Sequence, residues 1–372
     1  MQNDVVSYFL ELVAIDSESL NERGMIERLK SDLEQLGAET FVDDSHLKTG
    51  GNAGNLYGFL PGNIDKAPIL LCAHVDTVKP GNGIKPIIRD GVIYSDGTTI
   101  LGGDDKSGVA EIMVALRRLK ASGKDHAPIE VLFTISEEIG LLGARGFDKS
   151  RLKSSFGYAF DTHVVGEIII GAPSQKSFKI TINGKEAHAG VEPEKGLNAI
   201  LIASEAITRM PMGRIDPETT CNIGIIKGGT ATNIVPNTVY LKGEARSHNP
   251  DKLQKLCAEI RKAFDDAVQK HSEKGASMDF ICNQEYHSFL MDESSEAVQL
   301  AIKALKDLDI PYTTGRTGGG SDANIFNAAG FPMIICGTGM DKVHTVDEKI
   351  EIAELIRGTD FVSQLIKHHS EA

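Results

Sequence analysis

The sequence predicts an α/β fold, in which a main domain with a mostly parallel sheet covered by helices carries a smaller inserted domain. Three observations support this prediction. The 372-residue chain is longer than the size at which a single hydrophobic core stops growing. Apolar runs of strand length alternate with segments of helical periodicity, as in sheets covered on both faces. Between about residues 173 and 287 the pattern changes to alternating polar and apolar residues, and it then changes back.

The N-terminal part alternates one helix with short strands. Apolar residues at helical spacing over residues 25–36, followed by Gly37, predict an amphipathic helix that ends at a glycine cap. Strand-like runs follow at residues 40–42, 56–60 and 69–78. Asp90-Gly91 within residues 87–94 is flanked by β-branched residues, which predicts a hairpin.

A glycine-rich loop precedes the next helix. Gly102 and Gly103 stand before Asp104 and Asp105, and two glycines allow a sharp turn at low steric cost. Apolar residues from Val109 to Leu119 predict the helix itself. Further strands are predicted at residues 129–135, 156–160 and 332–336, and further helical segments at 141–147 and 352–362.

The inserted domain is expected at residues 174–287, so that residues 1–173 and 288–372 form the main domain. Its predicted order is β-α-β-β-α-β, with strands near residues 178–182, 222–226, 238–245 and 278–282. This order is that of a split βαβ unit, which predicts a ferredoxin-like α+β fold.

Composition limits the classes of partner. The net charge of −13 and the pI near 5.4 count against a nucleic-acid groove or an anionic membrane surface, and favour a neutral or cationic small substrate. The five cysteines show no Cys-x-x-Cys spacing, which indicates buried, reduced thiols in a cytosolic protein. Neither a signal peptide nor a long apolar segment is visible, so we expect a cytoplasmic protein.

Polar side chains with metal-binding chemistry follow the predicted strands and the glycine-rich loop. In α/β sheets, ligands bind beyond the carboxyl ends of the strands. Histidines and carboxylates without thiolates suit zinc, manganese or cobalt, and one carboxylate can bridge two ions. The candidates are His74, Asp76, Asp104, Glu137, Glu138, Asp161 and His344.

Pairwise spacing suggests roles but leaves them open. His74 and Asp76 are two residues apart, so in a strand they share a face, and the carboxylate could accept the second imidazole N–H of His74. Of the adjacent Glu137 and Glu138, one could bind metal while the other accepts a proton from water.

Each candidate also has an ordinary structural explanation. Adjacent glutamates are commonly solvated, and Asp161 could shape a turn. Asp104 and Asp105 could favour the start of the following helix through its dipole. His344 could belong to a capping segment. Their joint occurrence at strand ends is what predicts a two-metal site.

These motifs resemble the M20 family of di-zinc peptidases and deacylases, and the resemblance covers nearly the whole chain. Residues 95–106 and 343–348 resemble its peptidase T branch of tripeptide aminopeptidases. The residues that carry the family resemblance are His74-Val75-Asp76-Thr77, the loop 102–108, Glu137-Glu138, Asp161 and His344.

The resemblance implies a ligand set and a mechanism. It assigns His74 and Asp161 to one zinc ion and Glu138 and His344 to the other, with Co²⁺ or Mn²⁺ as alternative metals. It further implies that Asp104 bridges the ions and is followed by a cis peptide bond to Asp105. Glu137 would be the general base, and Asp76 would orient His74.

Further residues match family positions in or near the inserted domain. His188 resembles a histidine that reaches a neighbouring active site and stabilises an oxyanion, which implies a homodimer formed through the inserted domain. Asn233 and Arg246 resemble substrate-binding positions, and arginine suits a peptide carboxylate. Gly319 and Ser321 belong to a segment whose backbone N–H groups could approach an anion. The alternatives are a surface histidine and, at Asp322, a helix cap.

We therefore expect a di-zinc aminopeptidase that removes the N-terminal residue from short peptides, with tripeptides as the first candidates. One alternative is another amide hydrolase of the same family, an N-acyl amino acid deacylase or a carboxypeptidase. Another is a non-catalytic, metal-dependent binding protein. The expected partner is a short peptide, with no nucleic acid and no membrane.

Overall fold

The computed structural model describes residues 4–371 of the chain, which divides into two compact units. The first unit runs to Gly171 and includes Leu290–Arg316 and the chain from Ser321 onward. The second unit comprises Ala172–Phe289 and Thr317–Gly320. An α/β fold with an inserted α+β unit is thereby confirmed.

The first unit is built on a nine-stranded mixed sheet. Its path is β1-β2-β6-β3-β7-β16-β8-β14, and β15 pairs with β8. Strands β6, β3, β7 and β16 are mutually parallel, whereas β1, β2 and β8 run antiparallel to neighbours in this path. The strands are β1 (Glu39–Val42), β2 (Leu56–Leu60), β3 (Ile69–His74), β6 (Ile129–Thr134), β7 (Gly157–Thr162), β8 (Glu167–Ala172), β14 (Phe289–Leu290), β15 (Thr313–Arg316) and β16 (Met333–Gly337).

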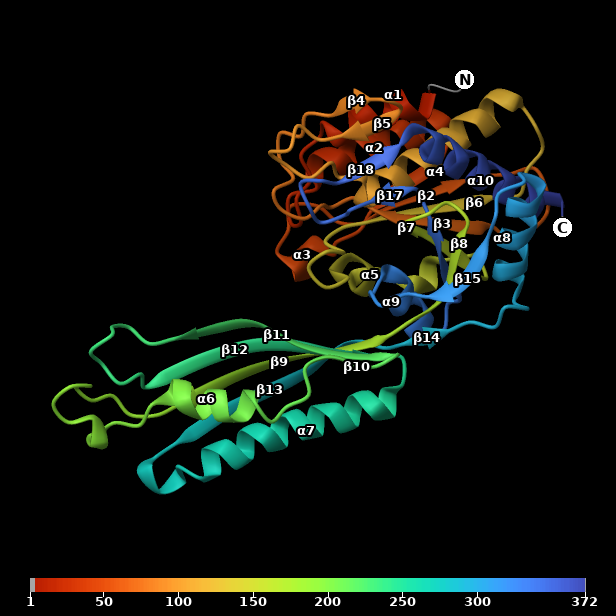
Figure 1. The fold of residues 1–372 in the computed structure, drawn as a ribbon. Coiled ribbons are helices and arrows are strands. Elements are labelled where there is room, and N and C mark those ends of the chain that lie inside the picture. Colours follow the sequence, from red (N-terminus) through yellow and green to blue (C-terminus); the bar gives the residue numbers. More distant parts are fainter. Residues whose placement is uncertain (1–3, 372) are drawn as a thin grey trace. The chain divides into compact units, whose positions relative to one another are not determined.

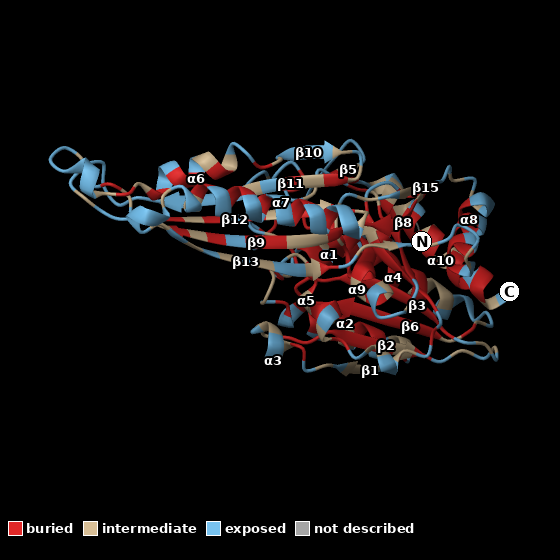
Figure 2. Ribbon diagram, turned by 90° about the horizontal axis from the view of Figure 1, so that it is seen from below, coloured by how far each residue is buried: buried red, intermediate tan, exposed pale blue. Residues whose placement is uncertain are grey.

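Helices cover both faces of this sheet, which explains why β3 and β6 are mainly apolar and are buried along their whole length (Figure 2). Helices α1 (Asp4–Val13), α2 (Arg23–Leu36), α4 (Gly103–Ser122) and α10 (Ile352–Glu371) lie on one face (Figure 1). Helices α5 (Leu142–Gly146) and α9 (Asp322–Ala328) lie on the other. Helix α8 (Glu296–Asp307) packs against α10 and β16, and α3 (His46–Thr49) is a single turn near α5.

A small antiparallel sheet brings two loops of the first unit together. Its order is β17-β18-β5-β4, formed by β4 (Ile87–Arg89), β5 (Val92–Tyr94), β17 (Met340–Asp341) and β18 (Lys349–Glu351). The predicted hairpin is confirmed, because Arg89 pairs with Val92 across Asp90 and Gly91, whose φ angles are 53° and 76°. Since β18 pairs with β5, the sheet ties the loop 342–348 to the chain that leads into α4.

The second unit is a five-stranded antiparallel sheet with two helices on one face (Figure 1). Its long strands lie in the order β11-β12-β9-β13, which is the ferredoxin-like order, and the short β10 extends the sheet at one edge. The sequence pattern did not predict β10. The elements are β9 (Ser174–Asn183), α6 (Ala199–Ile207), β10 (Gly213–Asp216), β11 (Thr219–Gly228), β12 (Thr238–Ser247), α7 (Pro250–Gln269) and β13 (Ser277–Tyr286).

Two general expectations can be compared with the structure. All five cysteines are free thiols, and four of them are buried. Within residues 4–371, no helix has both the length and the hydrophobicity needed to cross a bilayer.

Candidate metal centre

His74 is the last residue of β3, and it is 3% exposed. Its Nδ1 lies 3.0 Å from the backbone carbonyl oxygen of Asp76 and 3.5 Å from Oδ1 of the same residue. Its Nε2 lies 2.9 Å from Oδ1 of Asp104 and 3.8 Å from Oδ1 of Asp161. A proton on Nδ1 therefore leaves the Nε2 lone pair directed toward two carboxylates, as a metal ligand requires.

Asp104 contacts a different histidine with each carboxylate oxygen. Oδ1 faces His74, and Oδ2 lies 3.2 Å from Nε2 of His344. The loop before it turns at Gly102, whose φ is 74°, and the expected cis peptide bond between Asp104 and Asp105 is present. Two oxygens that face two imidazoles give this carboxylate the arrangement of a bridging ligand.

The other two candidate ligands come from separate elements. Glu138 lies in the turn after β6, and its Oε1 is 3.0 Å from Nε2 of His344. His344 lies in the loop between β17 and β18 with a φ of 62°, a conformation that is uncommon outside glycine. Asp161 lies within β7 rather than after it, because the strand expected to end at Phe160 continues to Thr162.

The structure thus brings all five predicted ligands together. The ligand atoms of His74, Asp104 and Glu138 lie within 4.8 Å of one another, as do those of His74, Asp105 and Asp161. Two imidazoles with several carboxylates, without thiolates, form a donor set that suits two divalent ions such as Zn²⁺, Mn²⁺ or Co²⁺.

The electrostatics of the site also fit bound cations. Burial raises the pKa of Asp161 to about 8, and it raises the pKa values of Glu137 and Glu138 as well. Hydrogen bonds with Asp104 and Glu138 raise the pKa of His344 to about 10. Raised pKa values show that these buried carboxylates lack nearby positive charge, which divalent ions would supply.

Asp76 holds the turn that carries the two glutamates. Its Oδ1 accepts a hydrogen bond from the backbone N–H of Glu137 at 2.8 Å, and its Oδ2 accepts one from that of Glu138 at 3.3 Å. The hydroxyl of Ser19 also donates to Oδ2, at 2.7 Å. The carboxylate is therefore engaged mainly with this turn, while the backbone carbonyl of Asp76 is the closer partner of the His74 ring.

The sequence did not reveal several other residues that build the site. Glu22 accepts hydrogen bonds from the N–H and the hydroxyl of Ser136, at 3.1 and 2.7 Å, and Ser136 itself has a φ of 52°. Asp105 accepts a hydrogen bond from the N–H of His74 at 3.2 Å. Asp105 lies inside one of the motifs that carry the family resemblance, so the sequence did contain a signal for it. Ser19 and Glu22 gave none, because they lie in an ordinary polar segment.

Three of the predicted residues, His188, Asn233 and Arg246, belong to the second unit. His188 and Asn233 lie on neighbouring exposed segments, joined by a hydrogen bond of 2.9 Å from the N–H of Ala189 to the carbonyl of Asn233. Arg246 is paired with Glu244, at 3.0 Å from Nε to Oε1, and its Nη1 donates to the carbonyl of Gly318 at 3.3 Å.

Gly319 and Ser321 fall in different units. The N–H of Gly319 donates to Oγ1 of Thr317 at 3.1 Å, within the second unit. Ser321 is buried in the first unit, and its N–H donates to Oδ1 of Asn324 at the start of α9. A hydrogen bond with Ser321 lowers the pKa of Asp161, against the larger effect of burial.

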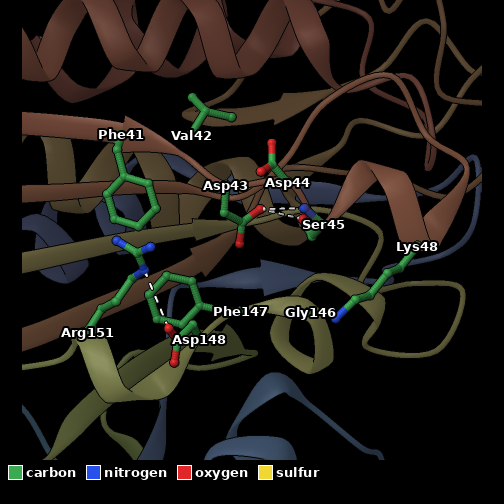
Figure 3. Close-up of a pocket in the computed structure, with 10 residues that line it drawn as sticks. All are labelled: Phe41, Val42, Asp43, Asp44, Ser45, Lys48, Gly146, Phe147, Asp148 and Arg151. Atoms are coloured by element: carbon green, nitrogen blue, oxygen red, sulfur yellow. Dashed lines mark hydrogen bonds and ion pairs between the residues drawn. The ribbon is translucent and has the colours of Figure 1, made fainter.

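A cavity of about 270 Å³ is lined by ten residues, none of which is a candidate metal ligand (Figure 3). The guanidinium of Arg151 lies 4.7 Å above the ring of Phe41 at its rim. The carboxylate of Asp43 accepts a hydrogen bond from Nδ2 of Asn55 at 2.7 Å, and Oδ1 of Asn55 accepts one from the N–H of Ile135 at 3.1 Å. This side of the cavity therefore supports the end of β6, from which the Glu137 turn begins.

The fold and this donor set define a metal-dependent hydrolase. Residues 70–368 match the model of peptidase family M20/M25/M40, and the chain belongs to this family of metallopeptidases.

Three relatives illustrate the match. The chain is 42% identical over 360 residues to the uncharacterized protein YqjE of Bacillus subtilis, and the alignment covers 96% of each chain. It is similar to the crystal structure of aminopeptidase PepT from Bacillus cereus, with a TM-score of 0.89, 42% identity and 99% of each chain covered. It is also similar to the crystal structure of a tripeptidase from Staphylococcus aureus, with a TM-score of 0.94 and 37% identity, covering 100% of this chain and 99% of the other.

Proposed function

We propose that this metallopeptidase is a two-metal aminopeptidase that removes the N-terminal residue from short peptides, with tripeptides as its principal substrates. The observation that carries the proposal is that the adjacent Glu137 and Glu138 are placed differently relative to the candidate ligands. Glu138 contacts His344, whereas Glu137 belongs to neither group of clustered ligand atoms. The named relatives, an aminopeptidase and a tripeptidase, support the same substrate class.

In this proposal His74 and Asp161 would hold one ion, Glu138 and His344 would hold the other, and Asp104 would be a ligand to both. Zn²⁺ is the proposed metal, with Co²⁺ or Mn²⁺ as alternatives. When bound, the ions would supply Lewis acidity, polarising the scissile carbonyl and lowering the pKa of water.

Glu137 moves the proton. Its carboxylate would accept a proton from the attacking water and return it to the leaving amine, so that the same side chain acts as base and then as acid. Burial raises the pKa of this carboxyl well above its usual range, which favours proton uptake. Asp76 fixes the position of Glu137 through the backbone hydrogen bond of 2.8 Å.

The remaining site residues are assigned to the substrate. His188 would stabilise the oxyanion, and Asn233, Arg246, Gly319 and Ser321 would contact the peptide. The carboxylate of Glu244 already neutralises part of the Arg246 charge, so a substrate carboxylate would share this guanidinium with it.

We further propose that the protein forms a homodimer through the second unit, with His188 acting on the partner's site. Strand β11 pairs with β12 along one edge, and on its other edge β10 pairs only with Thr219–Cys221. Beyond Cys221, this outer edge of β11 has no strand partner within residues 4–371. Ile226 on this strand is 53% exposed. An apolar strand edge of this kind is suited to pairing with its own copy.

Replacing Glu137 by glutamine tests the catalytic assignment. The Glu137→Gln variant should bind the same number of metal ions as the wild type and lose about 10²- to 10⁴-fold in kcat, since it retains shape but cannot carry the proton. Glu11→Gln, which alters an exposed glutamate in α1, is the matched control and should leave kcat unchanged. Near-normal turnover of Glu137→Gln would refute the role.

A peptide panel tests the substrate class. Free tripeptides should be hydrolysed, and their N-acetylated forms should not, in the presence of added Zn²⁺, Co²⁺ or Mn²⁺. Hydrolysis of the acetylated peptides would instead favour the deacylase alternative, and release of the C-terminal residue would favour a carboxypeptidase. We place the enzyme in the cytoplasm, where its five free thiols would stay reduced, and cell fractionation tests this placement.

A further inference from the structure

Glu348 organises the loop that presents the bridging aspartate. It ends the loop between β17 and β18, and it is 1% exposed. Its Oε2 accepts hydrogen bonds from the N–H groups of Leu101 and Gly102, at 2.7 and 2.8 Å. Its Oε1 accepts one from the N–H of Asp104 at 3.0 Å. Both oxygens are thus committed to the backbone of one short segment, which forms an anion-binding concavity around them.

The carboxylate of Glu348 also lies close to the backbone at Gly103. A Cβ built on Gly103 would lie 3.1 Å from Oε1 of Glu348. This is tighter than most Cβ contacts, so a side chain there would make the carboxylate shift by a few tenths of an ångström. The glycines of this loop therefore allow the contact with Glu348 as well as the turn itself.

The same glutamate is connected to the second histidine ligand. Glu348 and His344 lie four residues apart in one loop, and the backbone N–H of Glu348 donates to the carbonyl of Thr345 within it. His344 is exposed, and it has no strand of its own to fix it. His74 and Asp161, in contrast, belong to β3 and β7, which are neighbouring parallel strands of the central sheet.

We propose that Glu348 is a positioning residue that sets the distance between Asp104 and His344, and thereby controls the affinity for the ion that these residues hold with Glu138. The inference rests on the two-metal site of the proposed function. Asp104 is assigned to both ions, but the other two ligands of the first ion, His74 and Asp161, are fixed by the sheet, so that ion depends less on Glu348. The loss of the Glu348 carboxylate therefore acts on the two ions unequally.

The variant Glu348→Gln removes the carboxylate with almost no change in size. A glutamine offers one acceptor oxygen and directs an NH₂ group at backbone donors, so at least one of the three N–H groups loses its partner. Glu130→Gln is the matched control. Glu130 is also fully buried and accepts hydrogen bonds from two backbone N–H groups, of Lys153 and Ser154, but it lies near the opposite end of its strand from the metal centre.

The experiment is a titration of the metal-free proteins with Co²⁺, followed by visible absorption and checked by elemental analysis. The wild type and Glu130→Gln should bind two ions with the same affinities. Glu348→Gln should keep one affinity within about threefold of the wild-type value and lose about 10- to 100-fold in the other, the usual effect of removing a group that orients a ligand. Urea unfolding of the metal-free forms measures the loss of stability separately for both variants.

The outcomes separate this inference from the proposed function. Fewer than two ions bound by the wild type would overturn the two-metal proposal and this inference with it. If Glu348→Gln binds both ions with the wild-type affinities, the inference is overturned but the two-metal proposal is not. The same holds if the affinities for both ions fall by the same factor. If Glu348→Gln does not fold, Glu348→Asp, which keeps the charge on a shorter side chain, is titrated instead and should show the same unequal weakening. Failure of both variants to fold would show a role in folding and would also overturn the inference.

Discussion

Replacing Glu111 by glutamine should make the stability of the protein less dependent on pH. Glu111 lies in α4 and is fully buried, and neither of its carboxyl oxygens has a hydrogen-bond partner within residues 4–371. Burial raises the pKa of this carboxyl well above its usual value, and the charges of Asp105 and Glu354 add to the effect. The folded protein therefore holds Glu111 in its neutral form.

The sign of the pH effect follows from this raised pKa. In the unfolded chain, Glu111 ionises as the pH rises through its ordinary value near 4.5, whereas in the folded protein it keeps its proton until the raised pKa is reached. Over that window the folded state binds more protons, so the contribution of Glu111 to stability decreases as the pH rises. The slope for one such group is about 1.4 kcal/mol per pH unit.

Urea unfolding of the metal-free wild type and Glu111→Gln at pH 5.5 and 6.5 measures this contribution. All other titrating groups are common to both proteins and cancel in the comparison. The stability of the wild type relative to the variant should fall by about 1.4 kcal/mol between the two pH values, with an unchanged denaturant slope. A difference between the two proteins that does not vary with pH would refute the reasoning, because it would mean that Glu111 is equally ionised in both states.

Four further outcomes are expected. Gly358→Ala would place a Cβ 2.1 Å from Oε1 of Glu111 and should lower the free energy of unfolding by about 1–3 kcal/mol in the same assay. Adding Glu111→Ala to this variant should recover part of the loss, because the clashing carboxylate is removed. Strictly additive effects of the two substitutions on stability would contradict the contact. Asp76→Asn should lower kcat about 10- to 100-fold with both metal ions retained, and an unchanged kcat would show that the Glu137 turn does not need this carboxylate. Chelation should lower the melting temperature and added Zn²⁺ should restore it, whereas a melting temperature insensitive to metal would argue against a folded-state metal site. Ile226→Lys should convert the dimer to a monomer in sedimentation, and a monomeric wild type would exclude the dimer altogether.

The central strands could be predicted because their burial leaves a direct trace in the sequence. Strands β3 and β6 are covered on both faces and therefore have mainly apolar sequences, which are interrupted in β6 by the buried Glu130. The turn at Asp90-Gly91 could also be predicted, because both residues adopt positive φ angles and hairpin turns of this kind favour the Asp-Gly sequence. The ends of the strands were predicted less accurately. The run expected at residues 69–78 forms a strand that ends at His74, and β7 continues through Asp161 instead of ending before it.

The candidate ligands could be predicted because histidines and carboxylates at the ends of apolar strands are chemically unusual. Their supporting groups could not be predicted, since each acts across a long stretch of chain. Glu22 and Ser136 are 114 residues apart in the sequence, and Glu348 and Asp104 are 244 apart. No local sequence pattern links such pairs. The residue type alone does not distinguish a buried acid that accepts a hydrogen bond from a backbone amide from an acid exposed to solvent.

These supporting acids have a common physical cause. Turns that carry metal ligands leave the strand ladders and the regular helix pattern, so their backbone N–H groups lose the partners that secondary structure provides, and a buried N–H without a partner is costly. Asp76, Glu22 and Glu348 each supply the missing acceptors to one such segment. Acidic residues around this centre therefore fall into two groups, those that face the metal sites and those that face backbone amides. Replacement of the second group should be detected first as altered metal affinity or turnover, because these carboxylates determine where the ligands and the general base are held.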